Sequence, residues 1–121
     1  MAYGRKLTGG RYKKQRKKKH YERPGISRLV TLGKERKKKI RGMGGTQKIV
    51  LLSCDKANIL DKKTNKFKIA KILNVKETPS NRFMARKNIM MKGAVIETEL
   101  GKAKITNRPG QEGQINAILI E

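Results

Sequence analysis

The amino-acid sequence predicts an all-β protein: a small antiparallel β-barrel of about six short strands, with one short helix and a basic extended N-terminal arm. Two observations carry this prediction. From residue 26 onward, short apolar runs alternate with glycine-containing turns, a pattern typical of small barrels. Before residue 26, basic residues take the place of the apolar runs. The 121-residue chain is therefore expected to divide into an arm (1–25) and a barrel domain (26–121).

Positive charge is concentrated in the arm. The chain has 32 Lys and Arg against 9 Asp and Glu, a formal net charge of +23. Residues 11–23 hold eight Lys or Arg and one Glu, and their only sizeable apolar groups are Tyr12 and Tyr21. Such a segment buries too little apolar surface to offset the entropy of ordering, so we expect it to be disordered without an anionic partner. The plain alternative is a solvated tail.

Three strand-like runs follow the arm. The first, at 28–32, alternates in polarity so that Val30 and Leu32 share one face. The second, at 36–41, is an unusually charged strand that ends at a glycine-rich turn, 42–45. The third, at 49–54, is a continuous apolar run of the length expected for a strand buried on both sides.

The middle of the chain predicts a hairpin. A short strand at 57–60 is followed by a polar loop at 61–66 and a long strand at 67–75. Apolar residues lie on both faces of that long strand, Phe67 on one and Ala70 on the other. The pattern predicts a strand that is either buried twice or bulged.

One segment has the pattern of a helix. Residues 82–88 follow Ser80 and Asn81, either of which is suited to cap the first turn. Thr78-Pro79 ends the preceding strand. We therefore expect a single short helix here.

The last part of the chain returns to strands. Alternation at 94–100 and again through residue 105 predicts a hairpin with Gly101-Lys102 as its two-residue turn. A turn-rich loop at 107–113 then precedes the final strand, 115–120. Closing the sheet into a barrel removes exposed strand edges.

No catalytic set or metal site emerges from the residue types. His20 has no second imidazole and no cysteine near it in sequence, so no metal constellation is predicted. Cys54 follows an apolar run and is interpreted as a buried small hydrophobe. A single cysteine excludes an internal disulfide and fits a reducing, cytoplasmic compartment best. We expect no cofactor and no small-molecule substrate.

One carboxylate pair keeps an enzymatic alternative open. Glu97 and Glu99 share a strand face, and two carboxylates can perform acid–base or metal-assisted hydrolysis of RNA. Because Lys102 and Lys104 follow on the predicted return strand, cross-strand ion pairing is the preferred interpretation.

Nucleic acid is the partner that the charge favours. Membrane binding is disfavoured because no apolar run of 18 or more residues exists and the arm lacks the apolar face of an interfacial helix. Regular phosphates reward many spread cations through counterion release, and tyrosines suit the unpaired bases of folded RNA. The residues predicted to contact RNA are Arg5, Lys6, Arg11, Tyr12, Lys13, Lys14, Arg16, Lys17, Lys18, Lys19, His20, Tyr21, Arg23, Lys37, Lys38, Lys39, Arg41, Gly42, Gly44, Gly45, Arg82, Arg86, Lys87, Asn88, Lys92 and Arg108.

Several short motifs, taken in order, resemble the ribosomal protein S8e family. These are Arg-Lys-Leu-Thr-Gly-Gly at 5–10, the basic run ending in Tyr-Glu at 17–22, Arg-Gly-Met-Gly-Gly at 41–45, Lys-Gly-Ala at 92–94, and Thr-Asn-Arg-Pro-Gly-Gln-Glu-Gly at 106–113. The chain departs from the family pattern at Thr46, where Asn is usual, and at 23–25, where a Gly-Arg pair is usual. Its short length is similar to that of archaeal members.

The resemblance implies a β-barrel that binds small-subunit ribosomal RNA beside neighbouring small-subunit ribosomal proteins, in the cytoplasm and without catalysis. The arm would thread between RNA helices. The alternative is a ribosome assembly factor of the Nsa2 type, a group that shares the C-terminal domain but carries a much longer N-terminal part.

Overall fold

Nine strands form the folded body of the chain in the computed structural model, which describes residues 4–13, 15–25 and 27–120. The strands are β1 Val30–Leu32, β2 Arg36–Arg41, β3 Gln47–Cys54, β4 Lys56–Asp61, β5 Lys66–Glu77, β6 Ile89–Met90, β7 Val95–Thr98, β8 Gly101–Ile105 and β9 Asn116–Leu119. The described helices are α1 Arg82–Arg86, α2 Pro109–Glu112 and the 3-10 turns η1 His20–Glu22 and η2 Met43–Gly45. The predicted all-β class is confirmed.

Five of these strands close into a barrel. Their order is β4-β5-β7-β8-β9, and β9 returns to pair with β4 in parallel, with Asn58 opposite Asn116. A closed barrel with an odd number of strands must contain at least one parallel pair, so the expected fully antiparallel barrel is corrected here. Alanines and isoleucines alternate along the interior, as Ala57 and Ile59 do on β4, which suits the narrow bore of a small barrel.

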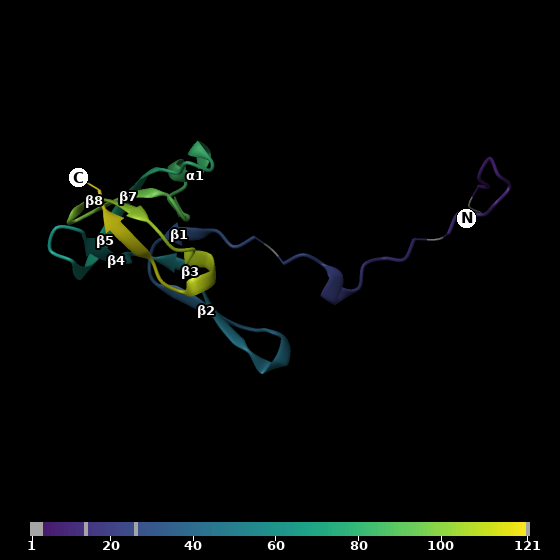
Figure 1. Ribbon diagram of the computed structural model, residues 1–121, viewed down its shortest axis with the longest axis horizontal. Coiled ribbons are helices and arrows are strands. Elements are labelled where there is room, and N and C mark those ends of the chain that lie inside the picture. Colours follow the sequence, from purple (N-terminus) through teal and green to yellow (C-terminus); the bar gives the residue numbers. More distant parts are fainter. Residues whose placement is uncertain (1–3, 14, 26, 121) are drawn as a thin grey trace.

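The other four strands form a separate sheet in the order β2-β3-β1-β6. This sheet and the barrel share one core, in which Val30, Leu51 and Met90 from the sheet pack with the barrel interior. Only Asp55 separates β3 from β4, so the chain passes directly from the sheet into the barrel. Figure 1 shows the β2–β3 hairpin projecting from this body and the arm extending well away from it.

The long strand β5 is bulged rather than buried twice. Register shifts occur between Ile72 and Asn74 and between Val75 and Glu77. Phe67 is 73% exposed, so the bulged alternative is the correct one. Ala70 and Ile72 are buried two positions apart, and the bulge after Ile72 lets Val75, three positions further on, face the core as well.

The hairpin of β7 and β8 turns two residues earlier than expected. Thr98 is paired with Gly101 and Glu97 with Lys102, so the turn consists of residues 99–100. The Thr98 hydroxyl donates a hydrogen bond to the Gly101 carbonyl oxygen at 2.8 Å and holds this turn closed. Gly101, at φ +122°, begins the return strand instead of forming the turn.

Two short α-helices replace the single expected one. The predicted helix is α1, and Asn81 caps it by accepting a hydrogen bond from the Phe83 backbone N–H at 2.9 Å. The second, α2, lies inside the segment that was expected to be a loop; Pro109 begins it and Gly113 ends it in a left-handed conformation. No helix in the described part of the chain is long or apolar enough to cross a membrane.

Gly113 is the glycine at which both conformation and space exclude a side chain, and this predicts a measurable cost. Its φ is +72°, and an added Cβ would lie 2.9 Å from Ile49 Cγ2. We expect Gly113→Ala to lower the free energy of unfolding by about 2 to 4 kcal/mol, part from the left-handed backbone and part from overpacking. Urea denaturation measures this loss.

Gly93→Ala is the matched control. Gly93 also has a positive φ, +83°, but open space surrounds its Cβ position, so only the backbone cost of about 1 to 2 kcal/mol is expected. Equal losses in the two variants would contradict the proposed clash with Ile49.

Candidate nucleic-acid interface

Residues 5–11 of the arm form a small turn whose cationic side chains are exposed. Arg5 and Arg11 form an isolated antiparallel bridge, and the Gly9 N–H donates to the Lys6 carbonyl oxygen at 2.9 Å. Lys6 Nζ lies 5.8 Å from the centre of the Tyr12 ring, within the range of a cation–π contact. The charged side chains of this turn are exposed and face solvent.

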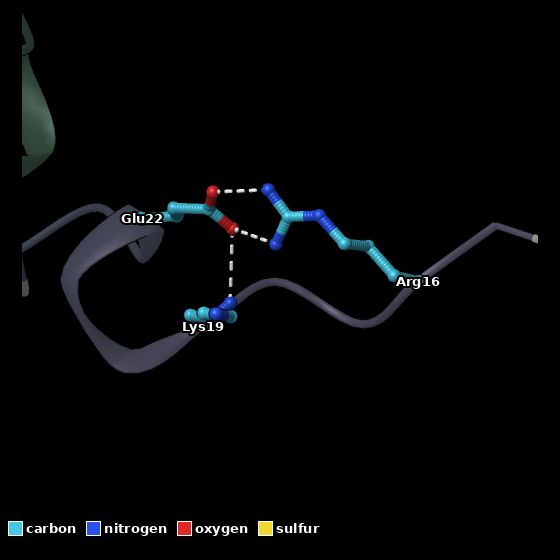
Figure 2. Close-up of polar contacts among 3 residues, drawn as sticks. All are labelled: Arg16, Lys19 and Glu22. Atoms are coloured by element: carbon cyan, nitrogen blue, oxygen red, sulfur yellow. Dashed lines mark hydrogen bonds and ion pairs between the residues drawn. The ribbon is translucent and has the colours of Figure 1, made fainter.

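The second turn of the arm uses its single acidic residue. The Glu22 carboxylate accepts hydrogen bonds from both terminal nitrogens of Arg16, at 2.8 and 2.5 Å, and from the Lys19 backbone N–H at 3.0 Å, as Figure 2 shows. The Arg16 guanidinium, and secondarily the Lys19 N–H, hold the pKa of the Glu22 carboxyl below its usual range. Glu22 therefore shapes the arm locally.

The remaining predicted arm residues are exposed, and each presents its charge or ring to solvent. They are Lys13, Lys17, Lys18, Lys19, His20, Tyr21 and Arg23. Lys14, which was also predicted to contact RNA, lies outside the described residues. The lysines and the arginine of this list, together with Arg5, Lys6 and Arg11, are distributed along an extended segment of backbone (Figure 1).

The β2–β3 hairpin supplies a second group of cations. Lys38, Lys39 and Arg41 are exposed on β2, which is an edge strand of its sheet. Lys37 is ion-paired with Glu35, and this carboxylate raises the pKa of the Lys37 ammonium. Lys37 is therefore the predicted contact of this strand whose charge is already partly neutralised.

The turn of this hairpin depends on glycine. The Gly42 N–H donates to the Thr46 carbonyl oxygen at 2.7 Å, and a Cβ on Gly42 would lie 2.6 Å from Thr46 Oγ1. Gly44 and Gly45 have φ values of +67° and +77° with open space around them. All three predicted glycines are exposed, and their backbone is free of side chains that would keep a large ligand away. Met43 at the tip is 94% exposed.

The third group surrounds α1. Arg82 and Arg86 are exposed, and their guanidinium carbons lie 5.4 and 5.8 Å from the centre of the Phe83 ring. Both arginines also line a hollow of about 400 Å³ that they share with Lys76 and Asn88. Asn88 is half-buried, and its Oδ1 accepts a hydrogen bond from the Val75 N–H at 3.2 Å, so this predicted contact also ties α1 to β5.

Three predicted cations lie near the ends of short elements. Lys87 follows α1, Lys92 lies in the turn after β6, and Arg108 immediately precedes α2; all three side chains are exposed. In Figure 1 the arm leaves the body on the side where α1 and the β2–β3 hairpin also project, whereas the turn between β4 and β5 lies on the opposite side. The arm, α1 and the β2–β3 hairpin thus project away from that turn.

The carboxylate pair does not form a reaction centre. Glu97 is ion-paired at 2.9 Å with Lys76 of the neighbouring strand β5, whereas cross-strand pairing with Lys102 or Lys104 was expected. Among the described residues, no group of three or more His, Cys, Asp or Glu is placed to hold a metal ion. Cys54 is buried in the core, as predicted.

Sequence reasoning missed two groups at α1. Both guanidinium groups lie within cation–π range of the Phe83 ring, and Lys76 lines the same hollow as the two arginines from the end of β5. Phe83 could have been identified from the sequence, because a residue three positions before an arginine on a helix lies on the same face. Lys76 could not, because the bulges in β5 decide which way its side chain points.

Comparison with known proteins identifies a family whose sequence pattern this chain matches. A model described as Ribosomal protein S8e matches residues 2–120. The small ribosomal subunit protein eS8 of Methanocorpusculum labreanum is 50% identical over 117 residues, which cover 97% of this chain and 94% of the relative. The protein of the same name from Sulfurisphaera tokodaii is 50% identical over 120 residues, covering 97% and 92%, and that from Saccharolobus islandicus is 48% identical over 118 residues, covering 97% and 89%.

The Glu22 contacts predict a pH dependence in the free protein. Because its pKa is lowered, the contribution of Glu22 to the turn is present above the usual pKa of a glutamate and is lost as the pH falls through the lowered value. Arg16→Gln removes the main cause, so the pKa of Glu22 should rise toward its usual value. The chemical shift of the Glu22 side-chain carboxyl carbon, followed by NMR through an acid titration, measures this.

Lys17→Gln removes the same charge one position along and serves as the control, with a much smaller effect expected on the pKa of Glu22. If both variants shift that pKa equally, general charge and not the Arg16 contact is its cause.

Proposed function

The chain belongs to the ribosomal protein S8e family, and we propose that it is a structural constituent of the small ribosomal subunit that binds and stabilises small-subunit ribosomal RNA. The relatives carry the name of a small-subunit protein in three archaea, which supports this over the alternative of an assembly factor of the Nsa2 type. The protein then works on the ribosome in the cytoplasm, beside neighbouring small-subunit proteins.

The observation that carries the proposal is the exposure of the arm's described cations, among which Arg16 is the one with a described acidic partner. Of the arm's charged groups from residues 11 to 23, one carboxylate faces eight cations, and that carboxylate is occupied by Arg16. Concentrated like charge repels itself, so a compact arm is unfavourable until phosphates lie between its turns. We infer that residues 1–25 take their final shape on RNA.

The mechanism is electrostatic. RNA helices repel when they pack, and a cationic segment threaded between them neutralises phosphates on both sides. The β2–β3 hairpin and the α1 region contact RNA on the same side of the body, which orients the arm relative to the barrel. Such contacts position RNA without reading its sequence. The role is support and assembly, and it requires no chemical step.

A salt titration tests the contribution of the arm. Replacing Lys17, Lys18 and Lys19 together by Gln should reduce the slope of log affinity against log salt by about 0.7 to 0.9 for each phosphate that is no longer neutralised. The expected reduction is about 2 to 3 if each lysine neutralises one phosphate. Binding of the full chain to a small-subunit ribosomal RNA fragment, measured over a range of salt concentrations, determines the slope.

The matched control is the triple replacement of Lys62, Lys63 and Lys66 by Gln. It removes the same net charge from the turn between β4 and β5, on the side opposite the arm (Figure 1). This variant should retain the slope of the original protein. No reduction in the arm variant would mean that the arm is a solvated tail, and equal reductions in both variants would mean that RNA contacts the two sides of the molecule alike.

A further inference from the structure

Phe83 is an aromatic side chain that the fold leaves in water. Its helix, α1, attaches to the core through Ala85, and Phe83 is 57% exposed. The other phenylalanine, Phe67, is also exposed on the outside of β5, but the described cation–π contacts of the body all belong to Phe83. The Phe83 ring is therefore exposed beside two guanidinium groups, and this sets it apart from an aromatic ring on an ordinary protein surface.

The flanking arginines connect the ring to a polar hollow. Arg82 and Arg86 line this hollow of about 400 Å³ together with Lys76, Asn74 and Asn88. That volume falls in the usual range of small-ligand sites. Three cations and two carboxamides offer donors to phosphate oxygens and to ribose hydroxyls, and one carboxylate, Glu97, bonds Lys76 from the side.

The ring and the hollow complement the two halves of a nucleotide. Guanidinium groups form paired hydrogen bonds with phosphate, and a ring beside them offers a flat apolar surface to a base. Bases inside a duplex are stacked on their neighbours and cannot use such a surface, whereas an unpaired base can be splayed out. Stacking on an aromatic side chain tolerates any base, because every base has a π-face.

We propose that α1 and the end of β5 form a site for one unpaired nucleotide of RNA. The base stacks on Phe83, and the adjoining phosphates lie against Arg82 and Arg86, with the ribose toward the carboxamides of the hollow. This inference rests on the proposed function and adds to it: the arm and the hairpin bind RNA by charge, whereas this site selects RNA that presents a bulged or looped-out base.

A competition between two RNA hairpins tests the site. Both hairpins are closed by a flexible non-nucleotide linker, so that neither has unpaired loop bases. One hairpin is fully paired, and the other has the same sequence with a single unpaired adenosine in its stem. The full-length protein should prefer the second by about 5- to 150-fold, which is the range for one base stacked on an aromatic side chain. The ratio is measured at a fixed, high salt concentration, because the hairpins differ by only one phosphate and salt screens that difference.

Three variants assign the preference to the ring. Phe83→Leu should abolish it while leaving the salt slope unchanged, since every cation that neutralises a phosphate remains in place. Phe83→Tyr keeps the ring and should keep the preference. Phe67→Leu, which removes an exposed ring from the outside of β5, should keep it as well. Both phenylalanines are more than half exposed, so thermal unfolding should confirm that every variant folds.

The outcomes separate this inference from the proposed function. If Phe83→Leu retains the preference, or the original protein binds both hairpins equally with a steep salt dependence, the nucleotide site is wrong and the electrostatic function stands. If the original protein binds neither hairpin nor a small-subunit ribosomal RNA fragment at physiological salt, the proposed function fails and the site fails with it.

Discussion

Repulsion among like charges is the constraint on which the arrangement of this protein depends. Residues 1–25 contain 10 Lys and Arg and only 1 Glu, so the arm is repelled both by itself and by the basic body. The fold keeps the apolar residues and most of this charge in different parts of the chain. Apolar residues after residue 27 form one shared core, and the cations remain on an extended segment where water and counterions screen them. Without this separation the same composition would oppose folding.

The interior of the barrel is narrow and is filled by small and branched side chains. Five alanines, at positions 57, 70, 94, 103 and 117, are fully or almost fully buried, and isoleucines fill the space between them. The odd number of strands makes β9 close on β4 in parallel. Outside the barrel, Gly113 at the end of α2 lies close to Ile49 of β3, so this helix packs directly on the four-stranded sheet.

Local patterns predicted most of this fold, and the failures have local physical reasons. Alternating polarity located β1 and the hairpin of β7 and β8 because side chains on a strand alternate between core and solvent. The pattern could not place the turn at residues 99–100, since Gly101 fits either a turn or the start of a strand. It also missed α2, because Pro109 and Gly113 mark a loop as readily as the two ends of a four-residue helix. The cations of the site were readable from composition, but their gathering on one side depends on tertiary structure.

The lysines of β2 show how one feature can serve both folding and binding. β2 is an edge strand, and lysines on an edge prevent pairing with another chain, so their presence has a structural reason before any RNA is considered. The same exposed ammonium groups lie beside a glycine turn that lets a large ligand approach the backbone. Docked RNA would cover the edge and replace the protection that the charges give to the free protein. The arm has no strand edge of comparable length to protect, and its cations therefore point to RNA more directly than those of β2.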